Sequence, residues 1–148
     1  MAFHFSLDSL LRLRRSVEHQ HEIALADAIR NVAQQQQKIA QLEDSLRQMM
    51  EQEEKQLASG AHAIGLQTAL YIRSRGVENL RELHNDLMHL KKIESACRAA
   101  LLRARQEREI LETLRERQLS QYHQDEARRE QRRVDDLFLL RREYRQRQ

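Results

Sequence analysis

Residues 57–66 read Leu-Ala-Ser-Gly-Ala-His-Ala-Ile-Gly-Leu, a stretch without a charged residue between two long, highly charged segments. Two of the three glycines in the chain, Gly60 and Gly65, lie here, and the third, Gly76, follows shortly after. The chain contains no proline. Because proline and glycine interrupt helices more strongly than any other residues, the sequence predicts one turn here, between two uninterrupted helices.

The flanking segments carry apolar residues at alternating intervals of three and four, which is the pattern of an amphipathic helix. In the first segment Leu25, Val32, Ile39 and Leu46 recur every seven residues. A second row of residues at similar spacing follows the turn: Leu80, Leu83, Leu87, Leu90, Cys97, Leu101, Ala104 and Leu111. A seven-residue repeat of apolar residues that is sustained in this way predicts helices that supercoil around each other. Gln35, Glu94 and Arg108 interrupt these rows, so the seam is imperfect.

We therefore predict an all-α fold in which two long helices form an antiparallel coiled-coil hairpin, as a single domain over residues 1–148. The first helix is expected over about 6–57 with Ser6 as its N-cap, the turn over about 58–66, and the second helix over about 67–145. With the turn centred near residue 62, residue i lies opposite about residue 124 − i. Residues 119–148 then overhang at the C-terminus by roughly 45 Å, at about 1.5 Å per residue.

Composition supports this prediction and limits the class of protein. Charged residues make up 33% of the chain and aromatic residues 4%, with no tryptophan, which is typical of a coiled coil rather than of a thick core. Disorder is the alternative, since high charge and few bulky residues are also its signature. The formal net charge of only +3 and the regular leucine spacing favour helices.

Several features of the sequence indicate the cellular compartment in which the protein is expected. Cys97 is the only cysteine, which excludes an intramolecular disulfide and favours a reducing compartment; its place in the apolar row predicts a packing role. No run of about 18 apolar residues predicts a membrane span. Asp8 and Arg12 interrupt the N-terminus before a signal peptide could form. We expect a cytoplasmic protein without direct membrane insertion, which reaches the membrane periphery only through a partner.

The predicted overhang carries an apolar patch among arginines. Its apolar members are Val134, Leu137, Phe138, Leu139, Leu140 and Tyr144. An apolar stripe without a partner in its own chain is expected to dock on another molecule, and a frayed, solvated end is the alternative. Clustered arginines also suit nucleic acid. Interspersed acids such as Glu130, Asp135 and Glu143 favour a protein surface instead, so we expect no nucleic-acid partner.

Residues with metal-ligand or catalytic chemistry are poorly placed for either role. No two histidines or cysteines stand four apart, the spacing that puts two ligands on one helix face. Glu18-x-x-His21 matches the Glu-x-x-His element of di-iron bundles, with Asp86-x-x-His89 as a near relative, but such a site needs four helices. We expect these residues to form a solvated helix surface, and we predict no metal, no cofactor, no catalytic residue and no enzyme activity.

Four segments together carry a family resemblance. They are the opening Phe3-x-Phe5-x-Leu7-x-x-Leu10-Leu11-x-Leu13-Arg14, then Ala69-Leu70-Tyr71-Ile72 after the turn, then residues 104–112, and finally Gln131-Arg-Arg-Val-Asp-Asp-Leu137. In this order, and with this length and turn position, the chain resembles the FliJ family of the bacterial flagellar type III export apparatus. The resemblance covers essentially the whole chain. Asp135-Asp136 stands where the family often has Asp-Glu.

The resemblance implies a stalk-like hairpin whose terminal ends enter the hexameric ring of the flagellar export ATPase. It also implies contact with the cytoplasmic domain of the export gate, and the escort of export chaperones. The ATPase-facing residues implied in this way are Leu7, Leu10, Leu11, Arg14, Val134, Leu137, Phe138 and Arg141. The gate-facing residues implied are Leu42, Met49, Tyr71 and Leu80. The family can carry additional aromatic residues late in helix one, where this chain has Ser45 and Met49.

Two alternatives remain open at the sequence level. A stalk of a virulence-type secretion system would share this architecture and differ in its partners. A self-associating coiled-coil scaffold would instead pair the overhanging tail with a second copy. The stalk interpretation predicts a monomer when the chain is alone, and the scaffold interpretation predicts a dimer.

Overall fold

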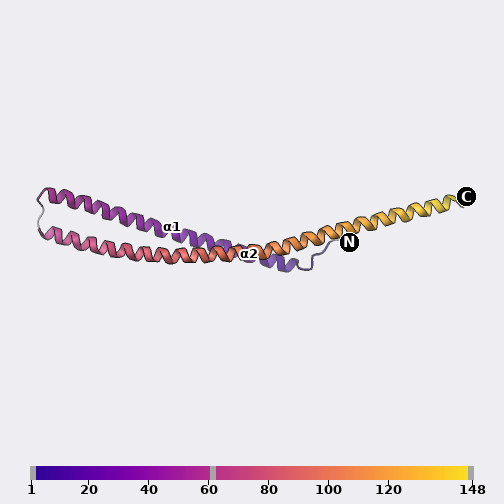
Figure 1. Ribbon diagram of the computed structural model, residues 1–148, viewed down its shortest axis with the longest axis horizontal. Coiled ribbons are helices and arrows are strands. Elements are labelled where there is room, and N and C mark those ends of the chain that lie inside the picture. The colour runs from indigo at the N-terminus through magenta and orange to yellow at the C-terminus, as the bar shows by residue number, and fades with distance from the viewer. Residues whose placement is uncertain (1–2, 61–62, 147–148) are drawn as a thin grey trace. The chain divides into compact units, whose positions relative to one another are not determined.

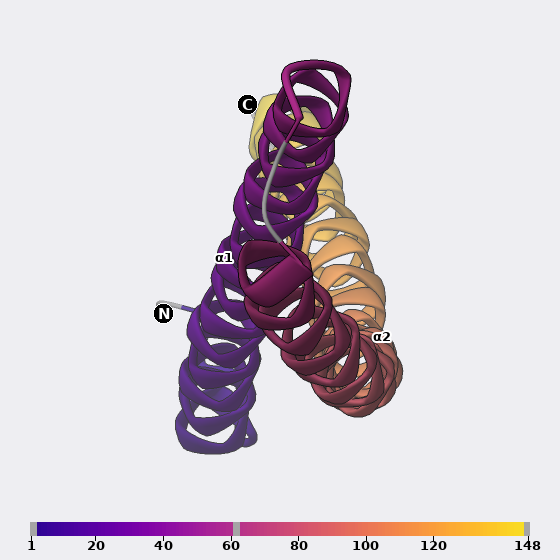
Figure 2. The same cartoon turned by 90° about the vertical axis from the view of Figure 1, so that its left-hand side faces the viewer.

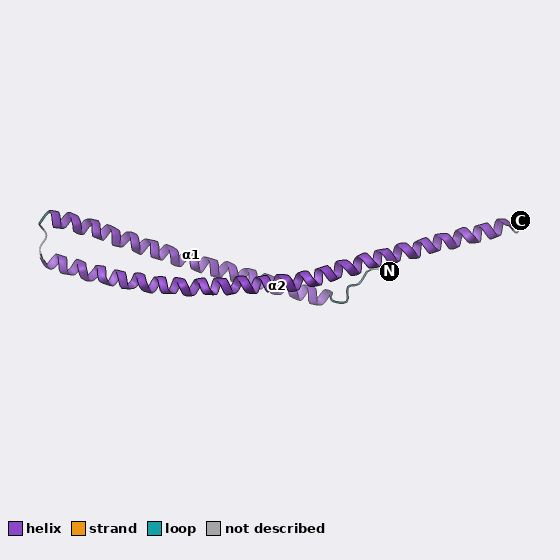
Figure 3. Ribbon diagram, viewed as in Figure 1, coloured by secondary structure: helices purple, strands orange, loops and turns teal. Residues whose placement is uncertain are grey.

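A computed structural model of the chain describes residues 3–60 and 63–146. These residues form two helices, α1 (Asp8–Ala58) and α2 (Ala63–Gln146), which are labelled in Figure 1. Within the described ranges there is no strand, as the colouring by secondary structure in Figure 3 shows. The prediction of an all-α fold built from two long helices is therefore confirmed.

The start of α1 differs from the prediction. The Leu7 carbonyl accepts the first helical hydrogen bond, from Leu11 N at 2.9 Å, so Leu7 and not Ser6 occupies the cap position. In the preceding turn Asp8 N donates to the Phe5 carbonyl at 3.2 Å. Phe5 itself is buried, with 4% of its surface exposed. The turn that buries this ring delays the start of the helix to Asp8.

The end of α1 depends on a glycine. Gly60 has a φ of +89° and its N–H donates to the Leu57 carbonyl at 3.3 Å, a conformation that L side chains rarely adopt. Residues 63–66, which we expected in the turn, already belong to α2, and Gly65 is therefore helical. Each residue added to an existing helix gains a hydrogen bond, which offsets the glycine penalty of about 1 kcal/mol. Residues 61–62 of the expected turn lie outside the described residues.

The chain divides into two compact units. We call residues 19–102 the hairpin unit, and residues 3–18 together with 103–146 the terminal unit. Each unit contains a segment of α1 and a segment of α2 that run in opposite directions, as Figures 1 and 2 show from two sides. The antiparallel arrangement predicted from the single turn is present in both units.

The hairpin unit buries the predicted seam. Ala28, Val32 and Ile39 of α1 are each 7–8% exposed. Gln35 lies among them, also buried, and its Nε2 donates to the Leu83 carbonyl of α2 at 3.0 Å. The residues that α2 contributes to this seam are buried or half-buried: Leu80, Leu83, Leu87, Leu90, Cys97 and Leu101. The buried polar Gln35 is thus satisfied across the two helices, and the predicted seam of α2 is confirmed.

Contacts of α2 with α1 and with the residues that precede α1 show which positions of the two halves of the chain lie opposite each other. In the terminal unit the Phe3 and Tyr122 rings lie 5.7 Å apart between centroids, where position 121 was predicted opposite Phe3. In the hairpin unit, a side chain at Gly76 would meet Leu46, for which position 78 was predicted. At these two positions the predicted register is confirmed to within two residues, whereas Gln35, for which position 89 was predicted, bonds to the Leu83 carbonyl, six residues away.

Beyond Tyr122 the helix α2 continues alone within the terminal unit. Every residue from His123 to Arg145 is exposed, and Figure 1 shows this segment in orange and yellow. The overhang begins after Tyr122 instead of at Leu119, which is half-buried. Residues 3–5 precede the helix, and an extended chain covers about twice as much length per residue as a helix. This lets Phe3 reach Tyr122.

Candidate functional site

The exposed C-terminal part of α2 carries the strongest candidate for a binding surface. We call residues 123–145 the tail. Its apolar side chains are all more than half exposed: Val134 53%, Leu137 58%, Phe138 67%, Leu139 56%, Leu140 63% and Tyr144 70%. A large apolar patch of this kind on a soluble protein marks a place where another molecule binds.

Over its last twelve residues, 134–145, the tail separates its charges by face. Residues three or four apart share a face of a helix, so Val134, Leu137 and Phe138 lie together, and Arg141 falls beside them. At 100° per residue, two carboxylates of this stretch, Asp136 and Glu143, lie on the other side. The face that carries Val134 and Phe138 is therefore apolar and cationic. It suits a partner surface that is apolar and acidic.

The residues of α1 that the resemblance placed at the ATPase lie in different environments. Leu7 is half-buried and Leu10 is 38% exposed, but Leu11 is only 1% exposed. Arg14 donates to Glu107 at 2.5 Å across the two helices. Leu11 therefore serves the interior of the terminal unit in this structure, and Arg14 is already paired.

The two halves of the implied ATPase site are not brought together. Phe3 contacts Tyr122, and Val134 lies twelve residues further along α2, which corresponds to about 18 Å of helix. The segment from Leu7 to Arg14 and the segment from Val134 to Arg141 thus occupy separate levels of the terminal unit. A single partner that binds both segments has to extend along this distance.

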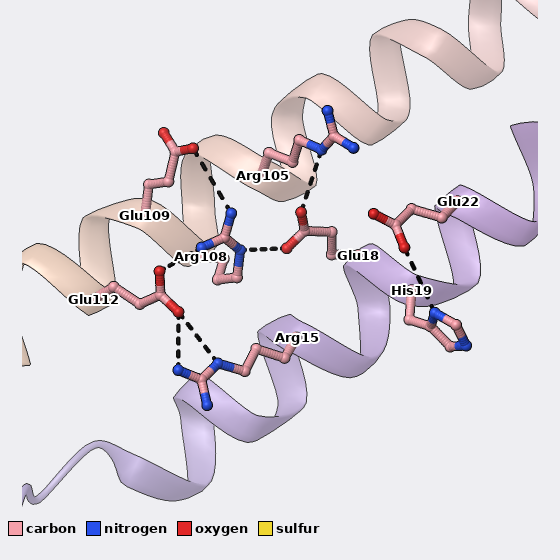
Figure 4. Close-up of polar contacts among 8 residues, drawn as sticks. All are labelled: Arg15, Glu18, His19, Glu22, Arg105, Arg108, Glu109 and Glu112. Carbon is pink, nitrogen blue, oxygen red and sulfur yellow. Dashed lines mark hydrogen bonds and ion pairs between the residues drawn. The ribbon is translucent and has the colours of Figure 1, made fainter.

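On α2, residues 105–112 precede Tyr122 as well as Val134, and in the terminal unit they take part in a group of ion pairs that joins α1 to α2 (Figure 4). We call its members the ionic cluster: Arg15, Glu18, Arg105, Arg108 and Glu112. Glu18 is 9% exposed; Arg105 Nε lies 3.3 Å from its Oε1, and Arg108 donates to its Oε2. Arg108 also donates to Glu112. Arg15 donates to Glu112 Oε1 from Nη2 at 2.9 Å and from Nε at 3.2 Å.

The hydrogen bonds of the ionic cluster favour the charged forms of Arg108 and Glu112. The hydrogen bond to Glu18 is the main cause that raises the pKa of Arg108, against the opposing effect of burial, and the charge of Glu112 adds to the rise. The pKa of Glu112 is lowered, mainly by the hydrogen bond from Arg15 and further by the charge of Arg108, while burial opposes this. Pairing of this kind offsets the desolvation cost that a buried or half-buried charge incurs.

The structure corrects our interpretation of Glu18. We expected the Glu18-x-x-His21 element to be part of a solvated surface, but Glu18 is buried and paired with two arginines. The signal that would have found this is the heptad itself, because Glu18 lies seven residues from both Leu11 and Leu25. In the described part of the chain, no group of three or more His, Cys, Asp or Glu residues is placed to hold a metal ion.

The implied gate-binding residues all lie in the hairpin unit. Leu42 and Leu80 are half-buried in the seam, whereas Met49 is 39% and Tyr71 66% exposed. A surface hollow close to the turn is lined from both helices: Met49, Gln52, Glu53, Gln56, Ala69 and Ile72. The hairpin unit therefore offers accessible apolar side chains near the turn, among them Met49 and Tyr71.

Neither helix contains, among the residues described, an apolar stretch long enough to cross a bilayer.

The fold and its exposed surfaces define a helical protein built to contact other proteins, and comparison with known families agrees. Residues 3–148, nearly the whole chain, match the family described as flagellar FliJ protein. No curated protein and no solved structure matches the chain. The chain belongs to the FliJ family, and as such it is a component of the flagellar protein export apparatus.

Proposed function

We propose that this chain is the stalk of the flagellar export apparatus. Its terminal unit binds the hexameric export ATPase, and its hairpin unit binds the cytoplasmic domain of the export gate. It also escorts export chaperones, and it needs no cofactor for these tasks. Membership of the family supports a role in export. The exposed tail supports the further step to a specific docking function.

The single observation that carries this proposal is the tail of α2. Its apolar side chains are more than half exposed, although burying a side chain such as Leu or Phe is worth about 1.5–3 kcal/mol. Arg141 lies on the same face as Leu137 and Phe138. A ring whose lining offers apolar side chains and carboxylates would bury this face and pair its charge, which favours orientation and rapid association.

The coupling between ATPase and gate is mechanical and thermodynamic. A helix that contacts one subunit interface of the ring more favourably when that interface is closed shifts the equilibrium towards closure there. By reciprocity, closure of an interface changes the affinity for the stalk. The chain supplies no chemistry in this scheme, because hydrolysis belongs to the ATPase.

The end of the hairpin unit is the part we assign to the gate. Met49 and Tyr71 are exposed there and lie near the hollow close to the turn, so both can contact a partner without unfolding the seam. Leu42 and Leu80 are half-buried and support these residues from within the seam. We propose that the chain works at the cytoplasmic face of the cell membrane, attached through the apparatus, and that motility and chemotaxis depend on it.

The test is a double substitution in the tail. Leu137→Asp together with Phe138→Asp places two carboxylates on the apolar, cationic face and should abolish stimulation of the cognate export ATPase. Helicity by circular dichroism should stay the same, because both side chains are exposed. The matched control is Met88→Asp with Leu102→Asp, which changes two exposed apolar residues elsewhere on α2, 62% and 58% exposed.

The control should keep full stimulation of the ATPase. Unchanged stimulation by the tail variant would remove the tail from the ATPase interface. Equal loss in both variants would show that α2 tolerates no added carboxylates, and the docking role of the tail would then lack support.

A second candidate follows from the same exposed apolar face. A self-associating scaffold would cover Leu137 and Phe138 with the tail of a second copy. The two candidates differ in oligomeric state, which a measurement on the isolated chain decides.

A further inference from the structure

Within the terminal unit, one face of α2 continues from the part that packs against α1 into the exposed tail. Eighteen residues make five full turns of an α-helix, so residues eighteen apart lie on the same face. Ala104, Tyr122 and Leu140 form such a series. Leu119 and Leu137 form another, each three residues before a member of the first series and therefore on a neighbouring line of the same side of the helix. The same stripe of α2 thus carries both the residues that pack in the terminal unit and two apolar residues of the tail.

This stripe is covered along one part and bare along the other. Ala104 is 4% exposed, and Leu119 and Tyr122 are half-buried. Leu137 and Leu140 are 58% and 63% exposed. What changes between the two parts is the presence of residues 3–18, which we call the arm. Phe3 of the arm contacts Tyr122.

Charge pairs join the arm to α2 beside its buried apolar side chains. Four ion pairs join them: Arg14–Glu107, Arg15–Glu112, Glu18–Arg105 and Glu18–Arg108. The fully buried apolar side chains that the arm contributes are Phe5 and Leu11. Salt screens pairs whose side chains are partly exposed, such as Arg14 with Glu107, at 38% and 49%.

The free-energy cost of separating the arm from α2 therefore differs from that of separating two purely apolar seams. When two apolar seams separate, both expose apolar surface to water. When Glu18 and Arg108 separate, both charges regain their hydration, and neither is left buried without a partner. A charged seam is thus the type of contact that can open while the rest of the helices stays paired.

We infer that the arm is a releasable cover of α2, held in place by the ionic cluster, and that its release extends the bare stripe of the tail back to the half-buried Leu111, which lies between the Arg14–Glu107 and Arg15–Glu112 pairs. Release is a property of the isolated chain. Its consequence for docking rests on the proposed function, because a partner that binds the tail then gains a longer stripe.

Hydrogen exchange on the full chain tests the release at low and high sodium chloride. Raising the salt from about 0.05 M to 1 M shortens the Debye length from above 10 Å to about 3 Å. Exchange of the amides of residues 11–18 should rise about tenfold, as expected for local opening, while the amides of residues 28–39 in the hairpin unit change less than about twofold. Rapid exchange of residues 11–18 at both salt concentrations, or equal acceleration in both segments, would overturn the proposal.

A matched pair of variants tests the role of the ionic cluster. Glu18→Gln should raise exchange of the arm at low salt, because the charge that pairs with both arginines is gone. Glu18→Leu with Arg108→Leu replaces this pair by apolar residues, so the arm should stay closed and respond less to salt, although Arg14–Glu107 and Arg15–Glu112 are still present. Glu78→Gln removes a carboxylate from an exposed pair of α2 and should change nothing in the arm. A response to salt that the double leucine variant retains in full would exclude the ionic cluster as the latch.

Exposure of the stripe needs a separate readout. In Leu111→Cys the new thiol lies between Glu107 and Glu112, which pair with Arg14 and Arg15 of the arm, and the half-buried Cys97 of the hairpin unit serves as an internal control. High salt should accelerate alkylation of residue 111 by about tenfold relative to Cys97, the same factor as for local opening. If high salt accelerated alkylation equally at both thiols, the arm would not be what covers this stripe.

Discussion

At the scale of single residues, charge at the seam distinguishes the terminal unit. Glu18 occupies a heptad position where Leu11 and Leu25, its neighbours in the series, are apolar. A lone carboxylate there would be costly, but two arginines of α2 reach it. Sequence spacing puts Glu18 on the seam, whereas its partners lie about ninety positions away in the chain. Only the register of the two helices selects them.

Glu112 predicts how stability depends on pH. Its pKa is lowered in the folded chain, so its stabilising contribution is fully present above the ordinary value of 4.5 and is lost as the pH falls through the lower folded value. The melting temperature should therefore fall as the pH drops below about 4.5. In Glu112→Gln this fall should be smaller, as thermal melts at pH 7 and in the acid range can show.

The control for this experiment is Glu116→Gln, an exposed position one turn further along α2. It should melt with the same dependence on pH as the unchanged chain. If Glu112→Gln also kept the full dependence, then the pairing with Arg15 and Arg108 would make no contribution to folding in this range.

The seam of the hairpin unit offers a matched pair of neighbours. Leu87 is half-buried, whereas Met88 is 62% exposed. Leu87→Asp should lower the free energy of unfolding by about 1–3 kcal/mol, because it places a carboxylate in the seam without a partner. Met88→Asp should change it by less than about 0.5 kcal/mol. Equal effects in urea unfolding would mean that the seam does not run through Leu87.

At the scale of elements, the two helices are long because nothing in the sequence stops them. Proline is absent, and the one glycine with positive φ, Gly60, lies where α1 ends. Gly65 and Gly76 are both incorporated into α2. Their surroundings differ, since no atom lies within 4 Å of a side chain built at Gly65, whereas a side chain at Gly76 would overlap Leu46.

These two glycines predict opposite effects on stability. Gly65→Ala should raise the free energy of unfolding by about 0.5–1 kcal/mol, because alanine loses less entropy in a helix and meets no neighbour. Gly76→Val should lower it by about 1–3 kcal/mol, because the added side chain pushes against Leu46 where the helices approach closely. Chemical unfolding followed by circular dichroism measures both. Stabilisation by both substitutions would show that the helices are further apart at this level.

At the scale of the whole molecule, the exposed tail separates the two candidate functions. As a stalk, the chain should sediment as a monomer of 17.7 kDa at all concentrations tested, because the tail awaits a different protein. As a scaffold, it should form a dimer that persists on dilution, since the apolar face would then be covered by a second copy. Sedimentation of the unchanged chain decides between them. Leu137→Asp with Phe138→Asp should dissociate any dimer that the tail mediates.

The sequence by itself determined the number of helices, the place of the turn, the apolar seam and the exposed tail. These features follow from local periodicity and from the positions of glycine and proline, which act over a few residues. The tertiary structure alone decided that Leu11 is interior, that Glu18 meets Arg105 and Arg108, and that the two implied ATPase-binding segments lie apart. These facts depend on which residues of α2 stand opposite each turn of α1, and the chain sets that alignment only when both helices pack together.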